Sequence, residues 1–102
     1  MRRMICDAIA AKRLLVFQYE GYERVVEPHL CGHNTAGHDA LLAWFVRGYS
    51  ESTAGPGWRT YLLNQMRSIR QLEETFERAR MGYNPTDGSM LLVYCQVPRA
   101  AA

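Results

Sequence analysis

The chain has 102 residues, of which 48% are hydrophobic and 22% are charged. This composition is typical of a globular protein and excludes a disordered chain, and the length allows only one hydrophobic core. The formal net charge of +2 is too small to indicate nucleic-acid binding by itself. We therefore expect one domain over residues 1–102, with its core at about 4–76 and a C-terminal loop and strand at 77–97.

No segment approaches the roughly 20 consecutive apolar residues that span a bilayer, and the basic N-terminal end lacks the apolar core of a signal peptide. The three cysteines, Cys6, Cys31 and Cys95, are odd in number, widely spaced and free of any CxxC pair. This pattern favours reduced thiols over a disulfide framework. We expect a cytoplasmic protein with no membrane partner.

The first half of the chain predicts one helix followed by strands. Apolar residues at helical spacing predict a short amphipathic helix over Met4–Lys12. Alternating side chains predict a strand over Leu14–Glu20, and Gly21 supplies a turn to a return strand over Tyr22–Glu27. Pro28 cannot donate a hydrogen bond to a neighbouring strand, so we expect it to end the return strand.

The middle of the chain alternates extended segments with loops. An extended segment over His29–His33 and a polar loop over Asn34–Gly37 precede Ala40–Val46, the most apolar strand of this half. A long loop over Gly48–Gly57 leads to a strand over Trp58–Leu63, and loops of such length are often functional.

The last part of the chain adds two further strands. Asn64 can cap a single helical turn that runs through Met66, and Ser68–Leu72 is the next strand. A loop over Ala79–Ser89 precedes a final strand over Met90–Val97. These elements predict a mainly β (α+β) fold, a small β-barrel with an N-terminal helix.

An ordered set of residues resembles the WYL domain of bacterial transcriptional regulators over Ile5–Phe76, about three quarters of the chain. In chain order the matching residues are Ala8, Ile9, Tyr19, Arg24, Val26, Glu27, Pro28, Leu41, Leu42, Ala43, Trp44, Arg59, Tyr61, Leu63, Ile69, Leu72 and Phe76. The Trp-Tyr-Leu triplet that names the family corresponds to Asp39, Ala40 and Leu41, so only its leucine is present. The segments around Gly48–Arg59 and Arg80–Asn84 resemble compact, single-domain bacterial relatives.

The resemblance implies an SH3-like or Sm-like barrel in which arginines and aromatic residues at one surface sense nucleotides, single-stranded nucleic acid or another effector. In larger members a DNA-binding winged helix precedes this domain. The present chain begins at the domain itself, so we do not expect it to recognise an operator directly, and a role in transcription regulation would need a protein partner. A family resemblance transfers a fold more safely than a function.

Two arginines and four aromatic residues form the predicted ligand-binding set. Guanidinium groups bind phosphate or carboxylate, and aromatic faces stack on bases. The predicted set is Tyr19, Tyr22, Arg24, Trp58, Arg59 and Tyr61. The alternative is that Tyr19 and Tyr61 are core residues and that Arg24 pairs with Glu20 or Glu27.

Metal binding and catalysis are two further functions on which the residues bear. His29, Cys31 and His33 share one face of an extended segment and His38 follows, but neighbouring side chains on one face stand about 7 Å apart, too far to meet on one ion. The sequence contains no GxSxG, P-loop or HExxH motif. We therefore expect no metal, no cofactor and no enzymatic activity.

The final strand suggests a further possibility. Residues 90–97 are apolar on both alternating faces, and such a strand needs burial on both sides. The alternative function is therefore that of a structural or assembly module, in which the protein forms a homodimer or larger homo-oligomer through this edge strand.

Overall fold

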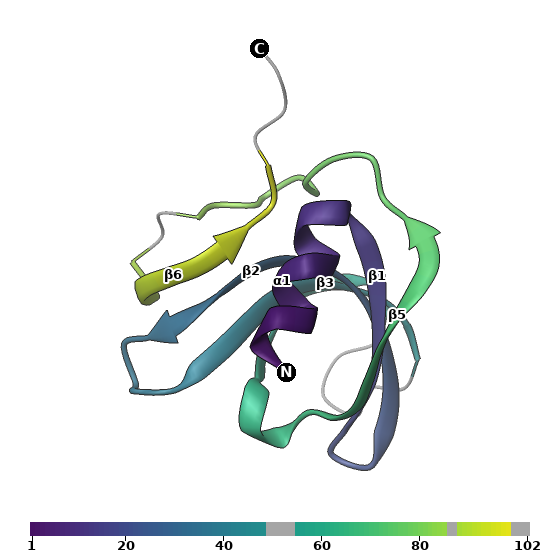
Figure 1. The fold of residues 1–102 in the computed structure, drawn as a ribbon, viewed down its shortest axis with the longest axis horizontal. Helices are drawn as coiled ribbons and strands as arrows, with labels where there is room; N and C mark the ends of the chain where they lie inside the picture. The colour runs from purple at the N-terminus through teal and green to yellow at the C-terminus, as the bar shows by residue number, and fades with distance from the viewer. Residues whose placement is uncertain (49–54, 86–87, 99–102) are drawn as a thin grey trace.

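The structure is a computed structural model that describes residues 1–48, 55–85 and 88–98 (Figure 1). Within these ranges the fold contains one α-helix and six strands, in agreement with the predicted α+β class. In chain order they are α1 (Arg2–Ala11), β1 (Arg13–Tyr19), β2 (Tyr22–Asn34), β3 (Asp39–Gly48), β4 (Gly57–Leu62), the 3-10 turn η1 (Leu63–Gln65), β5 (Arg67–Thr75) and β6 (Met90–Gln96). The strands form one antiparallel sheet in the order β4-β3-β2-β1-β5, and β6 pairs with β2.

The register places alternate side chains on two faces of the sheet. Cys31 pairs directly with Leu41 and with Cys95, and Leu41 pairs with Tyr61. Directly paired residues of antiparallel strands share a face. Cys95 is bonded to Cys6 of α1. We therefore call the side that α1 covers in Figure 1 the inner face, and the opposite side the outer face.

The helix and the inner face share the main hydrophobic core. Ile5, Ala8 and Ile9 of α1 are completely buried. Their spacing is the one that the amphipathic pattern of the sequence predicts. Lys12 ends the helix in the left-handed conformation with φ 53°, and its N–H bonds back to the carbonyls of Ala8 and Ile9. The helix therefore turns directly into β1.

The sheet is open among the described residues, because its order ends at β4 on one side and at β5 on the other. The mainly β fold with an N-terminal helix is confirmed, whereas the closed barrel is not observed. The long loop predicted over Gly48–Gly57 lies largely outside the described residues. No described helix is long and apolar enough to cross a membrane.

Pro28 does not end a strand, contrary to the prediction. It lies inside the 13-residue strand β2, paired with Ala43 at a register shift. The part of β2 before Pro28 pairs with β1 as far as Val26, and pairing with β6 starts only at Leu30. A missing N–H donor is tolerated at this position, because β2 has a partner there on its β3 side only.

The expectation of three reduced thiols is wrong for two of them. Cys6 and Cys95 form a disulfide that joins α1 to β6, with their Cα atoms 5.7 Å apart. Cys31 is a free, buried thiol. The expectation failed because the pairing joins residues 89 positions apart, and only the fold brings them together. The cytoplasmic location therefore loses the support that the cysteine pattern gave it.

Candidate functional site

Five of the six predicted ligand-binding residues lie on the inner face, and Tyr22 is the one of these five that stands at the end of the β1–β2 hairpin. Arg24 of β2 pairs directly with Phe17, two residues before Tyr19 on the same face of β1. On β4, Arg59 pairs with Ala43, two residues after Leu41, the partner of Tyr61. The alternation of strand side chains therefore places Tyr19, Arg24, Arg59 and Tyr61 on one side of the sheet, and we call these four residues the inner cluster.

The aromatic members of the inner cluster are packed into the core. The ring centroids of Phe17 and Tyr61, and those of Tyr19 and Tyr61, are each 5.0 Å apart in edge-to-face contact. The Tyr19 hydroxyl accepts a hydrogen bond from the N–H of Leu62 at 3.1 Å. The alternative that Tyr19 and Tyr61 are core residues is thus confirmed. Tyr22, the direct partner of Tyr19, is half-buried at the end of the hairpin.

The two guanidinium groups have different surroundings. Arg24 is only 5% exposed and donates from Nη2 to the carbonyl of Tyr19 at 3.3 Å, with the exposed carboxylate of Glu20 3.6 Å away. Arg59 is partly buried, lies over the ring of Phe45, and donates to the carbonyls of Trp58 and Gly55. Arg24 is therefore a buried cation whose acidic partner lies at the surface.

The Tyr61 hydroxyl and Nε of Arg24 are buried polar atoms to which no described residue offers a hydrogen bond of normal geometry. Burial raises the pKa of Tyr61, and the positive charges of Arg24 and Arg59, together with a hydrogen-bond interaction in which the Arg24 side chain is the donor, partly oppose that rise. The positive charges of Arg24 and Arg59 therefore both lie close enough to the Tyr61 hydroxyl to act on it. Buried polar atoms are nearly always hydrogen-bonded, and leaving one unsatisfied costs about 1–3 kcal/mol.

Trp58 is not part of the inner cluster, contrary to the prediction. It pairs directly with Trp44 on the outer face, with ring centroids 5.5 Å apart. Its ring centroid also lies 4.7 Å from that of His29 and 6.0 Å from that of Tyr83, on which the ring is stacked. Its Nε1 donates a hydrogen bond to the carbonyl of Met81. Adjacent strand residues point to opposite faces, so the neighbour of Arg59 cannot share its site.

The outer face carries an ionic cluster that the sequence did not reveal. The carboxylate of Glu27, a residue 5% exposed, accepts two hydrogen bonds from the Arg80 guanidinium, at 2.7 and 2.8 Å. The same guanidinium lies over the ring of Trp44, 5.2 Å from its centroid. The residues Glu27 and Arg80 are 53 positions apart, and no spacing rule connects a strand residue to a loop residue at that distance.

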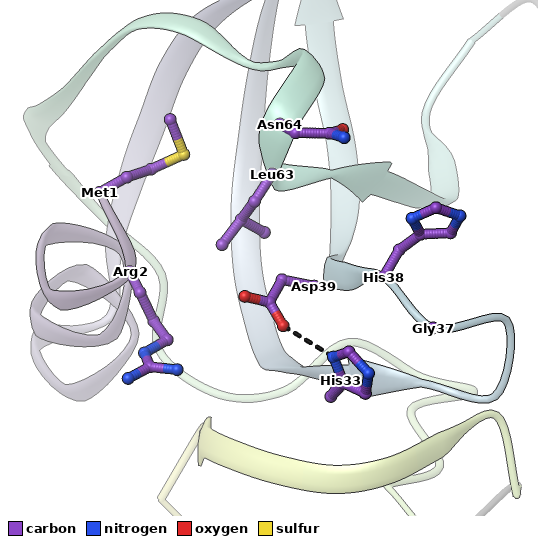
Figure 2. A pocket seen from close by; sticks show the side chains of 8 residues that line it. All are labelled: Met1, Arg2, His33, Gly37, His38, Asp39, Leu63 and Asn64. Atoms are coloured by element: carbon purple, nitrogen blue, oxygen red, sulfur yellow. Dashed lines mark hydrogen bonds and ion pairs between the residues drawn. The ribbon is translucent and has the colours of Figure 1, made fainter.

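The predicted His and Cys group is divided between separate environments. His29 is fully buried on the outer face, and Cys31 is buried on the inner face, where burial raises the pKa of its thiol to about 11. His33 and His38 line a pocket of about 470 Å³ near the start of α1 (Figure 2). Among the described residues, no three His, Cys, Asp or Glu side chains are arranged to hold a metal ion.

The pocket of Figure 2 has a hydrogen-bonded acid at its base. One oxygen of Asp39 contacts Nδ1 of His33 at 2.9 Å and accepts from the Tyr94 hydroxyl at 2.7 Å. These two contacts hold the pKa of Asp39 below its ordinary value. Arg2 of α1 lines the same pocket, and its guanidinium lies 4.1 Å from the centroid of the Tyr94 ring. The charges of Arg2 and Asp39 oppose each other, so the pocket has no clear preference for either sign of ligand.

Comparison with known proteins assigns no relative to the chain. No family model matches it, and no curated protein or solved structure matches it either. The resemblance to the WYL domain therefore stays a prediction from the residues quoted above. The inner cluster has the strongest physical claim to a ligand, because it combines two guanidinium groups with buried donors that have no acceptor.

Proposed function

We propose that this protein is a non-enzymatic sensing module that binds an anionic effector through the inner cluster. The observation that carries the proposal is a pair of buried donors for which the described residues offer no acceptor, Nε of Arg24 and the Tyr61 hydroxyl, beside two guanidinium groups. An anion placed there would accept hydrogen bonds from both atoms. It would also balance a buried positive charge whose acidic neighbour within 4 Å in the described part of the chain, Glu20, is solvent-exposed.

The chemistry of the donors defines the ligand class. Guanidinium groups bind phosphate and carboxylate oxygens through paired, charge-assisted hydrogen bonds, which are about twice as strong as neutral ones. Arg24 supplies the buried charge, and the partly exposed Arg59 gives the cluster a side that faces solvent. A small ligand with a terminal phosphate or carboxylate suits this arrangement.

A nucleotide or another small anion is favoured over single-stranded nucleic acid. Stacking of successive bases needs exposed aromatic faces beside the phosphate-binding groups. Tyr19 and Tyr61 are buried edge-to-face, and Trp58 faces the other side of the sheet. In an SH3-like domain that resembles the WYL family, such binding would be passed on to a protein partner.

The test is ligand-dependent thermal stability of the full chain. A ligand that binds only the native state at 100 times its Kd stabilises it by about 2.7 kcal/mol. Inorganic phosphate, AMP, ATP, acetate and dT oligomers are titrated against the wild type and against Arg24→Gln, Arg59→Gln and Tyr61→Phe. Arg47→Gln is the matched control, because Arg47 is an exposed arginine paired with Glu74.

We expect phosphate or a nucleotide to raise the Tm of the wild type and of Arg47→Gln, and to have little effect on the three cluster variants. Tyr61→Phe also removes an unsatisfied hydroxyl, so its ligand-free stability should equal or exceed that of the wild type. Binding that grows with dT length and falls steeply with salt would identify nucleic acid instead. Equal stabilisation of Arg24→Gln and wild type, or none of the wild type by any anion, contradicts the proposal.

Assembly through β6 is the second candidate function. Leu91, Leu92 and Val93 are 71%, 57% and 37% exposed, and among the described strands β6 pairs only with β2. An unpaired, apolar edge is a template for another strand, and a second copy of the chain would offer the same uncharged edge. Light scattering should then show a wild-type dimer and a monomeric Leu91→Lys/Val93→Lys variant. A monomeric wild type at high concentration excludes this candidate.

A further inference from the structure

Residues 77–85, which follow β5, lie against the outer face and are here called the strap. The strap has no regular secondary structure, and side chains of the sheet hold it in place. The Arg80 guanidinium pairs with Glu27, the Met81 carbonyl accepts from Nε1 of Trp58, and the Tyr83 hydroxyl contacts the amide oxygen of Gln96 at 3.3 Å. Each of these contacts uses at least one exposed or half-exposed group, and among the side chains involved only that of Glu27 is deeply buried.

His29 provides the buried contact to the strap backbone. Its side chain is completely buried between the rings of Trp58, Phe76 and Tyr83. Nδ1 lies 2.8 Å from the carbonyl of Glu27, and Nε2 lies 3.1 Å from the backbone nitrogen of Arg80. The two contacts make opposite demands: the carbonyl needs a proton on Nδ1, and the Arg80 N–H needs a lone pair on Nε2. Only the neutral imidazole with its proton on Nδ1 satisfies both.

We propose that the contact between His29 and the strap is pH-dependent: protonation of the His29 imidazole detaches residues 77–85 from the outer face. A proton on Nε2 would point at the N–H of Arg80, which replaces a hydrogen bond by a contact between two donors. The new charge would also lie in an apolar aromatic cage beside the Arg80 guanidinium. Movement of the strap relieves both, because it admits water to Nε2 and takes the Arg80 cation away.

In the described part of the chain, two charged groups act on His29. Its own strand contributes Glu27, and the strap contributes Arg80. Trp58 of β4 and Phe76, the residue after β5, contribute uncharged rings, and Tyr83 adds a neutral phenol whose pKa is raised by burial. Burial lowers the pKa of His29 from its ordinary value of 6.5, against the raising effects of the Glu27 carbonyl and carboxylate. The detached form should therefore accumulate below pH 6.5, and not at neutral pH.

Two tryptophans and one backbone amide can report on the detachment of the strap. The two tryptophans, Trp44 and Trp58, both lie on the outer face, where Trp44 is in contact with the Arg80 guanidinium. Hydrogen exchange of the Arg80 amide, measured as a protection factor from pH 7.5 downward, reports on the strap, and the amides of β1 report on the whole fold. The wavelength of tryptophan emission gives an independent reading.

The full-length wild type is compared with His29→Gln, whose side-chain oxygen can accept from the Arg80 N–H but does not titrate. His33→Gln and His38→Gln are the matched controls, since these are the only other histidines. We expect protection of the Arg80 amide to fall at least tenfold below pH 6.5 in the wild type and in both controls, together with a red shift of emission, while β1 stays protected. His29→Gln should keep its protection over the same range.

Three results would overturn the proposal: loss of strap protection in His29→Gln at the wild-type midpoint, no loss in the wild type before global unfolding, or loss only together with β1. If His29→Gln does not fold, the variant His33→Gln/His38→Gln decides the matter, because His29 is then the only histidine. In that variant the imidazole NMR titration of His29 must share its midpoint with the loss of Arg80 protection, and separate midpoints refute the coupling.

Discussion

The Cys6–Cys95 disulfide should contribute several kcal/mol to the stability of this protein. Its two cysteines are 89 positions apart, so the bond closes almost the whole chain into one loop. In the chain-entropy treatment, closing a loop of about 90 residues removes about 15.5 cal/mol/K from the unfolded chain, or about 4.6 kcal/mol at 25 °C. Native-state adjustments usually reduce the measured effect, and we expect a loss of about 2–4 kcal/mol on reduction.

Urea denaturation gives the free energy of unfolding with and without dithiothreitol, for the wild type and for Cys6→Ser/Cys95→Ser. The reductant should lower the free energy of unfolding of the wild type and leave that of the double variant unchanged. The double variant therefore controls for effects of the reductant other than cleavage of the disulfide. Thiol titration of the unfolded, unreduced protein should find one thiol, that of Cys31. Three reactive thiols, or equal stability with and without reductant, would refute the disulfide as a stabilising bond.

Three further predictions concern single side chains. Arg80→Met should destabilise the protein by about 2–4 kcal/mol in urea denaturation, because it leaves a buried carboxylate unpaired, whereas the exposed Arg47→Met should change stability little; equal effects would contradict this. Gly48→Ala should cost more than Gly37→Ala, since both have positive φ but only a Cβ at Gly48 meets backbone atoms of β2; equal unfolding free energies would argue against this close approach. The unfolding free energy should fall as pH drops below 6.5, by up to about 1.4 kcal/mol per pH unit, because the unfolded chain binds a proton that native His29 resists; the same slope in His29→Gln would assign it to other groups.

Local patterns in the sequence determined most of the secondary structure. Alternation over Leu14–Glu20 and the apolar run over Ala40–Val46 predicted two strands that the structure confirms as β1 and β3. The same period of two already places Arg59 and Tyr61 on one face and Trp58 on the other. The expectation that Trp58 joins the arginines therefore conflicted with a rule that the sequence itself supplies.

Only the tertiary structure decided which distant residues meet. The Cys6–Cys95 bond and the Glu27–Arg80 pair join positions 89 and 53 residues apart, and neither has a local signature. The continuation of β2 through Pro28 likewise depends on where its neighbours end and begin. Helical and strand periods act over a few residues, whereas these contacts follow from the order in which strands pair. The burial of the Tyr61 hydroxyl within the influence of two guanidinium charges is a product of that order, which local sequence patterns do not reveal.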